Sequence, residues 1–146
     1  MPYEEIALAL LDRGANPNDA SDTVSVLALA CLGGRHTLVK KMLEKGAAPN
    51  VGYFRDTPLM FMPDAESARL LIAHGAEVNA IDSRGGTALL SAVASGDIEL
   101  IEVLLQHGAQ VSVKDKKGFT PMTMQVDGSN SHHAKILALL RQYGAK

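Results

Sequence analysis

The segment TALLSAVASGDIELIEVLLQHGAQVS, at residues 87–112, decides the fold that this sequence predicts. It has the pattern of two short amphipathic helices, which end at Gly96 and Gly108. Glycine ends helices because it adopts the left-handed backbone conformation without a Cβ penalty. The second half of the segment recurs as LLDRGA at 10–15, MLEKGA at 42–47, LIAHGA at 71–76, LLQHGA at 104–109 and LRQYGA at 140–145. The glycines of these copies are 32, 29, 33 and 36 residues apart, and such a period is typical of stacked supersecondary units.

A wider pattern surrounds these glycines. The most regular unit contains Asp82, Gly85, Thr87, Leu89, Ala92, Gly96, Leu100, Ile101, Leu104, Leu105, Gly108 and Ala109. The next unit adds Asp115, Gly118, Thr120 and Pro121, and an earlier one has Thr57, Pro58 and Leu59, with Asn79 after its second helix. In these residues, over 6–146, the sequence resembles the ankyrin-repeat family. The family's motif histidine is absent, and Ala28, Met60, Leu90 and Thr123 stand in its place, so its hydrogen bonds must be replaced or lost.

The resemblance implies an all-α solenoid of about four and a half helix-turn-helix repeats with short hairpin fingers. We expect a single domain over residues 1–146, made of a half-repeat at 1–17 and repeats at about 18–49, 50–78, 79–111 and 112–146. In such a stack each unit covers the apolar face of its neighbour. The fingers and first helices line a concave face, which binds other proteins in this family. The expected function is therefore that of a non-enzymatic protein–protein interaction module.

Two units depart from the regular length. In the third, Thr57 and Pro58 start a helix, but Pro63 pushes the residue before it out of the α region, so the helix should stop near Met62. This helix is about one turn shorter than its counterpart in the fourth repeat. In the fifth repeat, the residues at 127–133 have a turn composition and predict a longer loop between the two helices.

The two ends of the stack are also atypical. Ile6, Leu10 and Leu11 predict one helix that packs on the second repeat, but its partner helix is missing. Either this half-repeat is a natural cap or the chain was cut from something longer. The uncovered side of the helix could support self-association. At the other end, Arg141 replaces a leucine and should face water.

Composition excludes several classes of protein. The chain has 146 residues, 47% of them hydrophobic, and a net charge of −2, which argues against a nucleic-acid or anionic-membrane binder. No apolar run is long enough to cross a bilayer, and the first residues do not have the pattern of a signal peptide. The single cysteine, Cys31, favours a reducing compartment, so we expect a cytoplasmic protein. We expect Cys31 to be a buried apolar side chain.

No residue pattern indicates catalysis or a cofactor. His74 and His107 occupy equivalent positions before a terminal glycine, where histidine interacts favourably with the helix dipole. His132 and His133 lack a cysteine or acidic ligand at metal-binding spacing. We therefore predict no enzyme, no cofactor and no metal. Two alternatives to a free-standing interaction module stay open, namely the recognition domain of a larger enzyme or adaptor, and a self-associating structural unit.

Finger positions that the fold does not fix are the candidate binding residues. Aromatic and arginine side chains are enriched where partners bind. The predicted site has its centre between the third and fourth fingers, at a notch left by the short helix, and extends to the fifth: Tyr53, Phe54, Arg55, Met60, Phe61, Arg84, Lys116, Lys117 and Phe119. Packing of Tyr53 and Phe54 on the short helix is the alternative.

One asparagine is a candidate for modification. Leu71 with Glu77, Val78 and Asn79 resembles the leucine and acidic-valine-asparagine pattern that asparaginyl hydroxylases recognise in ankyrin repeats. The alternative is that the Asn79 side chain stabilises the finger turn.

Overall fold

The computed structural model describes residues 2–19, 25–52, 56–61, 64–124 and 130–145. Its helices, in chain order, are α1 (Pro2–Asp12), α2 (Val26–Leu32), α3 (His36–Glu44), the 3-10 helix η1 (Pro58–Phe61), α4 (Ala65–Ala73), α5 (Ala88–Ser95), α6 (Ile98–Gln106) and α7 (Asn130–Gln142). The all-helical repeat architecture expected from the sequence is thereby confirmed.

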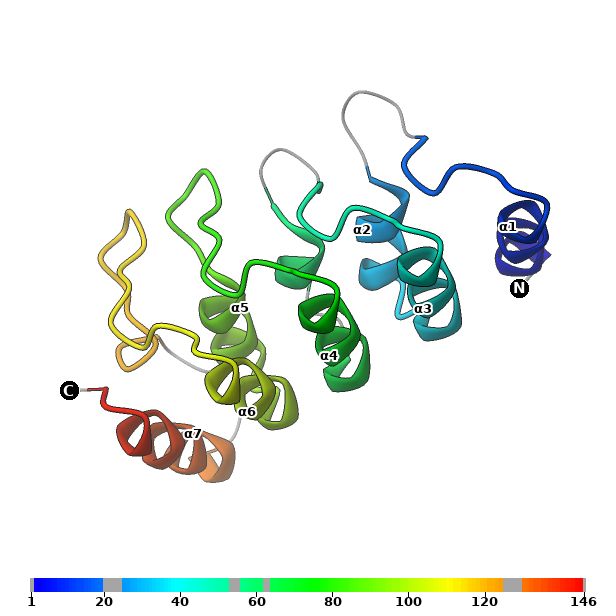
Figure 1. Cartoon of the computed structure of the whole chain (residues 1–146). Helices are drawn as coiled ribbons and strands as arrows, with labels where there is room; N and C mark the ends of the chain where they lie inside the picture. The colour runs from blue at the N-terminus through cyan, green and yellow to red at the C-terminus, as the bar shows by residue number, and fades with distance from the viewer. Residues whose placement is uncertain (1, 20–24, 53–55, 62–63, 125–129, 146) are drawn as a thin grey trace.

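The helices form two rows (Figure 1). In the outer row α1 packs on α3, α3 on α4, α4 on α6 and α6 on α7. In the inner row α2 packs on η1 and η1 on α5. The fingers of the fourth and fifth repeats project from one edge of the rows, and α1 and α7 lie at opposite ends of the stack. We call the surface formed by the fingers and the inner row the inner face.

Polar side chains begin the helices, and glycines follow their last turns. The side chains of Ser25, Thr87 and Asp97 accept hydrogen bonds from main-chain N–H groups in the first turns of α2, α5 and α6. Gly108 has a φ of 83°, as expected, and its N–H donates to the Leu105 carbonyl while the Ala109 N–H donates to that of Leu104. This is the Schellman arrangement that satisfies the last carbonyls of a helix.

The core runs continuously along the stack. The largest side chains with less than 2% exposure are Leu27, Met42, Leu59, Leu71, Leu89, Leu100, Ile101, Leu104, Ile136, Leu140, Val39 and Val93. Cys31 is buried among them, and burial, reinforced by the charge of Asp64, raises the pKa of its thiol to about 12. The prediction that Cys31 is a buried packing residue is confirmed, because its side chain is only 2% exposed.

The short inner helix of the third repeat is present as η1, which has four residues. Asp64 then caps α4 by accepting from the Ser67 N–H at 2.9 Å. Within the described residues, the buried hydroxyl of Thr57 has no hydrogen-bond partner. In the fifth repeat Thr123 replaces the missing histidine, because its hydroxyl accepts from the Thr120 N–H at 2.8 Å. The hydrogen bonds of the missing histidine are therefore lost at Thr57 and replaced at Thr123, which are the two outcomes expected from the sequence.

One loop prediction was wrong in the fifth repeat. Helix α7 begins at Asn130, so residues 130–133, predicted as loop, form its first turn. Asparagine and serine favour the start of a helix as much as a turn, and the composition alone does not decide between them. Arg141 is exposed beside the buried Leu140, as expected for the end of the stack.

The N-terminal helix is oriented differently from the prediction. Only Leu11 is buried, whereas Ile6 and Leu10 are 55% and 53% exposed. Helix α1 packs on α3 in the outer row, and its contact side is formed by Ala7, Leu8 and Leu11. Ile6 and Leu10 are one turn apart, so they share a face of α1 next to the side that contacts α3. A hollow of about 220 Å³ separates Leu10 from Val26 of α2.

Three asparagines link consecutive repeats, each four residues after a helix-ending glycine. Asn79 donates its side-chain amide to the Gly108 carbonyl at 3.0 Å and accepts from the Gln110 N–H at 2.8 Å. Asn50 bonds the Gly75 carbonyl and the Glu77 N–H in the same way. Asn18 repeats the pattern with the Gly46 carbonyl and the Ala48 N–H. We call these paired bonds the asparagine clamps. Asn79 therefore stabilises the next repeat instead of its own turn, and its hydroxylation stays a prediction.

Replacing Asn79 with alanine should lower the free energy of unfolding by about 1 kcal/mol, because both bonds of one clamp are lost. Urea denaturation followed by circular dichroism measures the change. Gln110→Ala is the matched control, since it retains the main-chain N–H that the clamp uses. Equal unfolding free energies for the two variants would show that the clamp contributes nothing.

Candidate functional site

Two neighbouring fingers have the same tight turn at their tips. In the fourth repeat the Asp82 N–H donates to the Gly86 carbonyl at 2.9 Å, and in the fifth the Asp115 N–H donates to the Phe119 carbonyl at 3.0 Å. Each aspartate also accepts two main-chain N–H groups of its own turn, from Arg84 and Gly86 at 2.7 and 2.6 Å and from Lys117 and Phe119 at 2.9 and 2.8 Å. The carboxylates are therefore part of the turns.

The two tips are joined directly. The Lys116 N–H donates to the Arg84 carbonyl at 2.8 Å. Beside this bond Gly85 has a φ of 80°, and a Cβ at Gly85 would lie 3.1 Å from both the Asp115 Cα and the Lys116 nitrogen. Only glycine combines this conformation with so close an approach of two backbones. The two fingers are thus held at a fixed separation.

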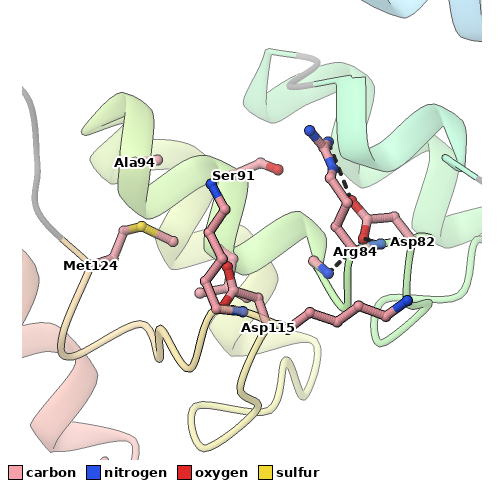
Figure 2. Close-up of a pocket in the computed structure, with 10 residues that line it drawn as sticks. Asp82, Arg84, Ser91, Ala94, Asp115 and Met124 are labelled. Carbon is pink, nitrogen blue, oxygen red and sulfur yellow. Dashed lines mark hydrogen bonds and ion pairs between the residues drawn. The ribbon is translucent and has the colours of Figure 1, made fainter.

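A hollow of about 380 Å³ lies on the inner face between these fingers and α5 (Figure 2). Figure 2 shows Ser91 and Ala94 on α5 behind it, Met124 on one side, and Asp82 and Arg84 on the other. Its lining residues are Asp82, Arg84, Gly86, Leu90, Ser91, Ala94, Asp115, Lys116, Lys117 and Met124. Its volume is at the lower end of the range for ligand sites.

The positively charged side chains of the hollow are more exposed to solvent than the carboxylate of Asp82. The Asp82 side chain is 9% exposed, whereas that of Arg84 is 81% exposed. Lys116 and Lys117 are also exposed, and neither forms an ion pair with another described residue. The Asp82 carboxylate is 3.4 Å from the Arg84 guanidinium. A molecule approaching from solvent therefore meets the cations first.

A further carboxylate lies near the fourth finger. Burial raises the pKa of Asp56, and the charge of Asp82 raises this pKa further, while that of Arg84 opposes the shift. Arg84 thus has acidic neighbours on the protein side, which leaves the two lysines as the unpaired cations of the hollow.

The arrangement is suited to binding. The hollow combines cationic side chains with a small apolar wall. Among the described residues, no group of three His, Cys, Asp or Glu side chains could hold a metal ion. No helix of the described part combines the length and apolar character that crossing a bilayer requires.

The predicted binding residues are only partly brought together. Arg84, Lys116 and Lys117 line the hollow, and Phe119, 40% exposed, lies in the turn that bounds it. Tyr53, Phe54 and Arg55 lie outside the described residues. Met60 and Phe61 are half-buried and pack against the core, and their part in binding stays a prediction.

The two histidines near helix ends have local roles. His74 Nδ1 donates to the Leu70 carbonyl at 2.8 Å, and His107 Nδ1 donates to that of Val103 at 2.7 Å. Each ring therefore satisfies a carbonyl in the last turn of its helix, which agrees with the expected interaction of these histidines with the helix end.

The sequence analysis did not identify the wall of the hollow. Ser91 and Ala94 are three positions apart on α5 and share a helix face, and Met124 comes from the segment after the fifth finger. The signal that could have identified the α5 residues is small side chains on an inner helix next to charged fingers.

Comparison with known proteins supports the repeat assignment. A family model described as ankyrin repeats, in three copies, matches residues 62–146. The chain is also 37% identical over 105 residues to glycerophosphocholine phosphodiesterase gde1 of the fission yeast Schizosaccharomyces pombe, a match that covers 67% of this chain and 9% of that protein. The chain thus spans a small part of the length of this relative.

The contact between the fingers can be tested by comparing two glycines. Gly85 and Gly118 have φ values of 80° and 85° at equivalent turn positions, but a Cβ at Gly118 would meet nothing within 4 Å. Gly118→Ala should cost about 1 kcal/mol of unfolding free energy from backbone strain alone. Gly85→Ala should cost about 1–3 kcal/mol more, because the fingers must also separate. Urea denaturation of both variants measures the difference, and equal losses would contradict the contact.

Proposed function

Because the chain belongs to the ankyrin-repeat family, whose repeats generally bind proteins, we propose that it is a non-enzymatic module that binds a protein partner through its inner face. The partner's main contact is the hollow between the fourth and fifth fingers. The observation that carries this proposal is the fixed separation of two fingers whose exposed cations border an open, partly apolar hollow.

Rigidity is the reason to favour this position. Binding costs less when the groups that make contact are already ordered. The turn bonds of Asp82 and Asp115 and the bond between Lys116 and Arg84 fix the main chain that carries the cations. The helix behind the hollow, α5, is anchored by buried Leu89, Ala92 and Val93.

The comparison with the yeast phosphodiesterase supports an extension of the proposal. A stretch similar to this chain makes up 9% of that enzyme, so such repeats occur within a longer enzyme. We therefore also propose that this module serves as the recognition part of a larger protein, with the same hollow as its contact.

Filling the hollow should abolish partner binding. Ala94 is exposed on α5 and lines the hollow, so Ala94→Trp introduces bulk there without disturbing the core. Blocking a true contact should cost about 2 kcal/mol, which is about thirtyfold in affinity. Partners captured by the wild-type chain from a native cell extract are identified by mass spectrometry, and their affinities for both proteins are measured by calorimetry.

The matched control is Gln106→Trp, which adds the same side chain at an exposed position of the outer helix α6. Circular dichroism verifies that both variants are folded. If every captured partner binds Ala94→Trp as tightly as Gln106→Trp, the hollow is not the binding site.

Self-association through α1 is a second candidate function. Ile6 and Leu10 of α1 and Leu29 of α2 are each more than half exposed, at 55%, 53% and 54%. Exposed apolar side chains on these two helices favour association. The hollow of about 220 Å³ between α1 and α2 lies at this end of the stack.

Association through this end should depend on Leu10. Sedimentation equilibrium should give a wild-type mass that rises with concentration and a Leu10→Lys mass that stays monomeric, because a lysine would place a charge in the contact. Ala9→Lys, at an exposed position of the same helix, adds the same charge and should behave as wild type. A wild-type mass that stays monomeric up to millimolar concentration would exclude this function.

A further inference from the structure

We infer that the hollow between the fourth and fifth fingers recognises an acidic segment of the partner, with carboxylates bound by Arg84, Lys116 and Lys117 and an adjoining apolar side chain placed against Ala94 and Met124. This inference rests on the proposed function and adds the chemistry of the ligand.

The charge arrangement selects a carboxylate. Arg84, Lys116 and Lys117 carry the exposed positive charges of the hollow. The carboxylates of Asp82 and Asp115 are already bonded to main-chain N–H groups of their own turns, with Asp82 nearly buried. An acidic partner thus gains attraction from Lys116 and Lys117, which form no ion pair with another described residue, and from the exposed guanidinium of Arg84 beside Asp82. A basic partner meets the same exposed cations first and is repelled by them.

The source of the negative charge is a peptide side chain and not a phosphate. Compact phosphate sites use several main-chain N–H groups that point at one anion. Here the N–H groups of Arg84, Gly86, Lys117 and Phe119 donate to Asp82 and Asp115, and the Lys116 N–H donates to the Arg84 carbonyl. Recognition therefore depends on three long side chains, which suit carboxylates spread along a peptide.

The wall of the hollow specifies the neighbour of the acidic residue. Ala94 is exposed, Met124 is half-buried, and Leu90 lies behind them. Methionine adapts its shape to the side chain it contacts. An aliphatic residue next to the acidic one would cover Ala94 and Met124 while its neighbour pairs with a finger cation. The expected ligand therefore combines aspartate or glutamate with leucine, isoleucine, valine or methionine.

The test uses a library of random peptides displayed on phage and selected on the immobilised full chain. Enriched sequences should combine acidic and aliphatic residues. The best of them, made as fluorescent peptides, are titrated by anisotropy against the wild type and against Arg84→Glu/Lys117→Glu. Reversing two contacting charges should weaken binding by about tenfold or more, and the wild-type affinity should fall as salt is raised.

Two further variants keep the result interpretable. Lys40→Glu/Arg69→Glu makes the same change in net charge at exposed positions of the outer helices α3 and α4, and should change affinity by less than about twofold. Lys116→Gln/Lys117→Gln removes two positive charges without adding carboxylates and should weaken peptide binding. This variant provides the test if Arg84→Glu/Lys117→Glu fails to fold.

The outcomes separate this inference from the proposed function. Neutral or basic peptides that bind the wild type but not Ala94→Trp would overturn the acidic ligand and leave the hollow as the binding site. The same holds for acidic peptides that do not bind Ala94→Trp but bind both charge-altered hollow variants as they bind the wild type. Peptides that bind Ala94→Trp and the wild type equally would overturn both, and a selection without any enriched peptide would overturn the inference alone.

Discussion

Each asparagine clamp joins the turn after one outer helix to the turn after the next, and the arrangement of the repeats depends on this link. In a stack of repeats each unit contacts only its neighbours, so every unit is positioned by those neighbours. Asn18, Asn50 and Asn79 satisfy a carbonyl and an N–H in the following repeat each time. The buried apolar side chains of both rows supply most of the stabilisation, because apolar burial is the dominant favourable term. The clamps fix the spacing at which that burial occurs.

The candidate binding site follows from the same constraint on the finger side. When the outer helices are held at one spacing, consecutive fingers come close enough for the Lys116 N–H to reach the Arg84 carbonyl. Gly85 permits this approach because it has no Cβ. The hollow between the fingers is thus defined by main-chain geometry, and the exposed side chains decide only its chemistry. The fourth asparagine position is occupied by Ser112, so the clamp pattern stops before the fifth repeat ends.

Much of this could be predicted from the sequence, since repeated glycines, caps and apolar spacing are local signals. The Schellman glycines, the short η1 and the buried Cys31 all follow from residues within one repeat. Contacts between different repeats were harder to predict from the sequence. The sequence pattern identifies Gly85 as a turn residue, but its contact with Asp115 depends on how two fingers are spaced. The exposure of Ile6 and Leu10 likewise depends on which side of α1 faces α3, and Asn130 is equally compatible with a loop and a helix start.

A ligand that binds between two fingers held at a fixed separation should affect those fingers and the helix behind them. Amide NMR shifts of the labelled full chain, measured while a selected peptide is titrated, locate the contact. The largest shift changes should occur in residues 84–94 and 115–124, with the outer helices α3, α4 and α6 little affected. Shift changes confined to α1 and α2, or to the outer helices, would contradict it.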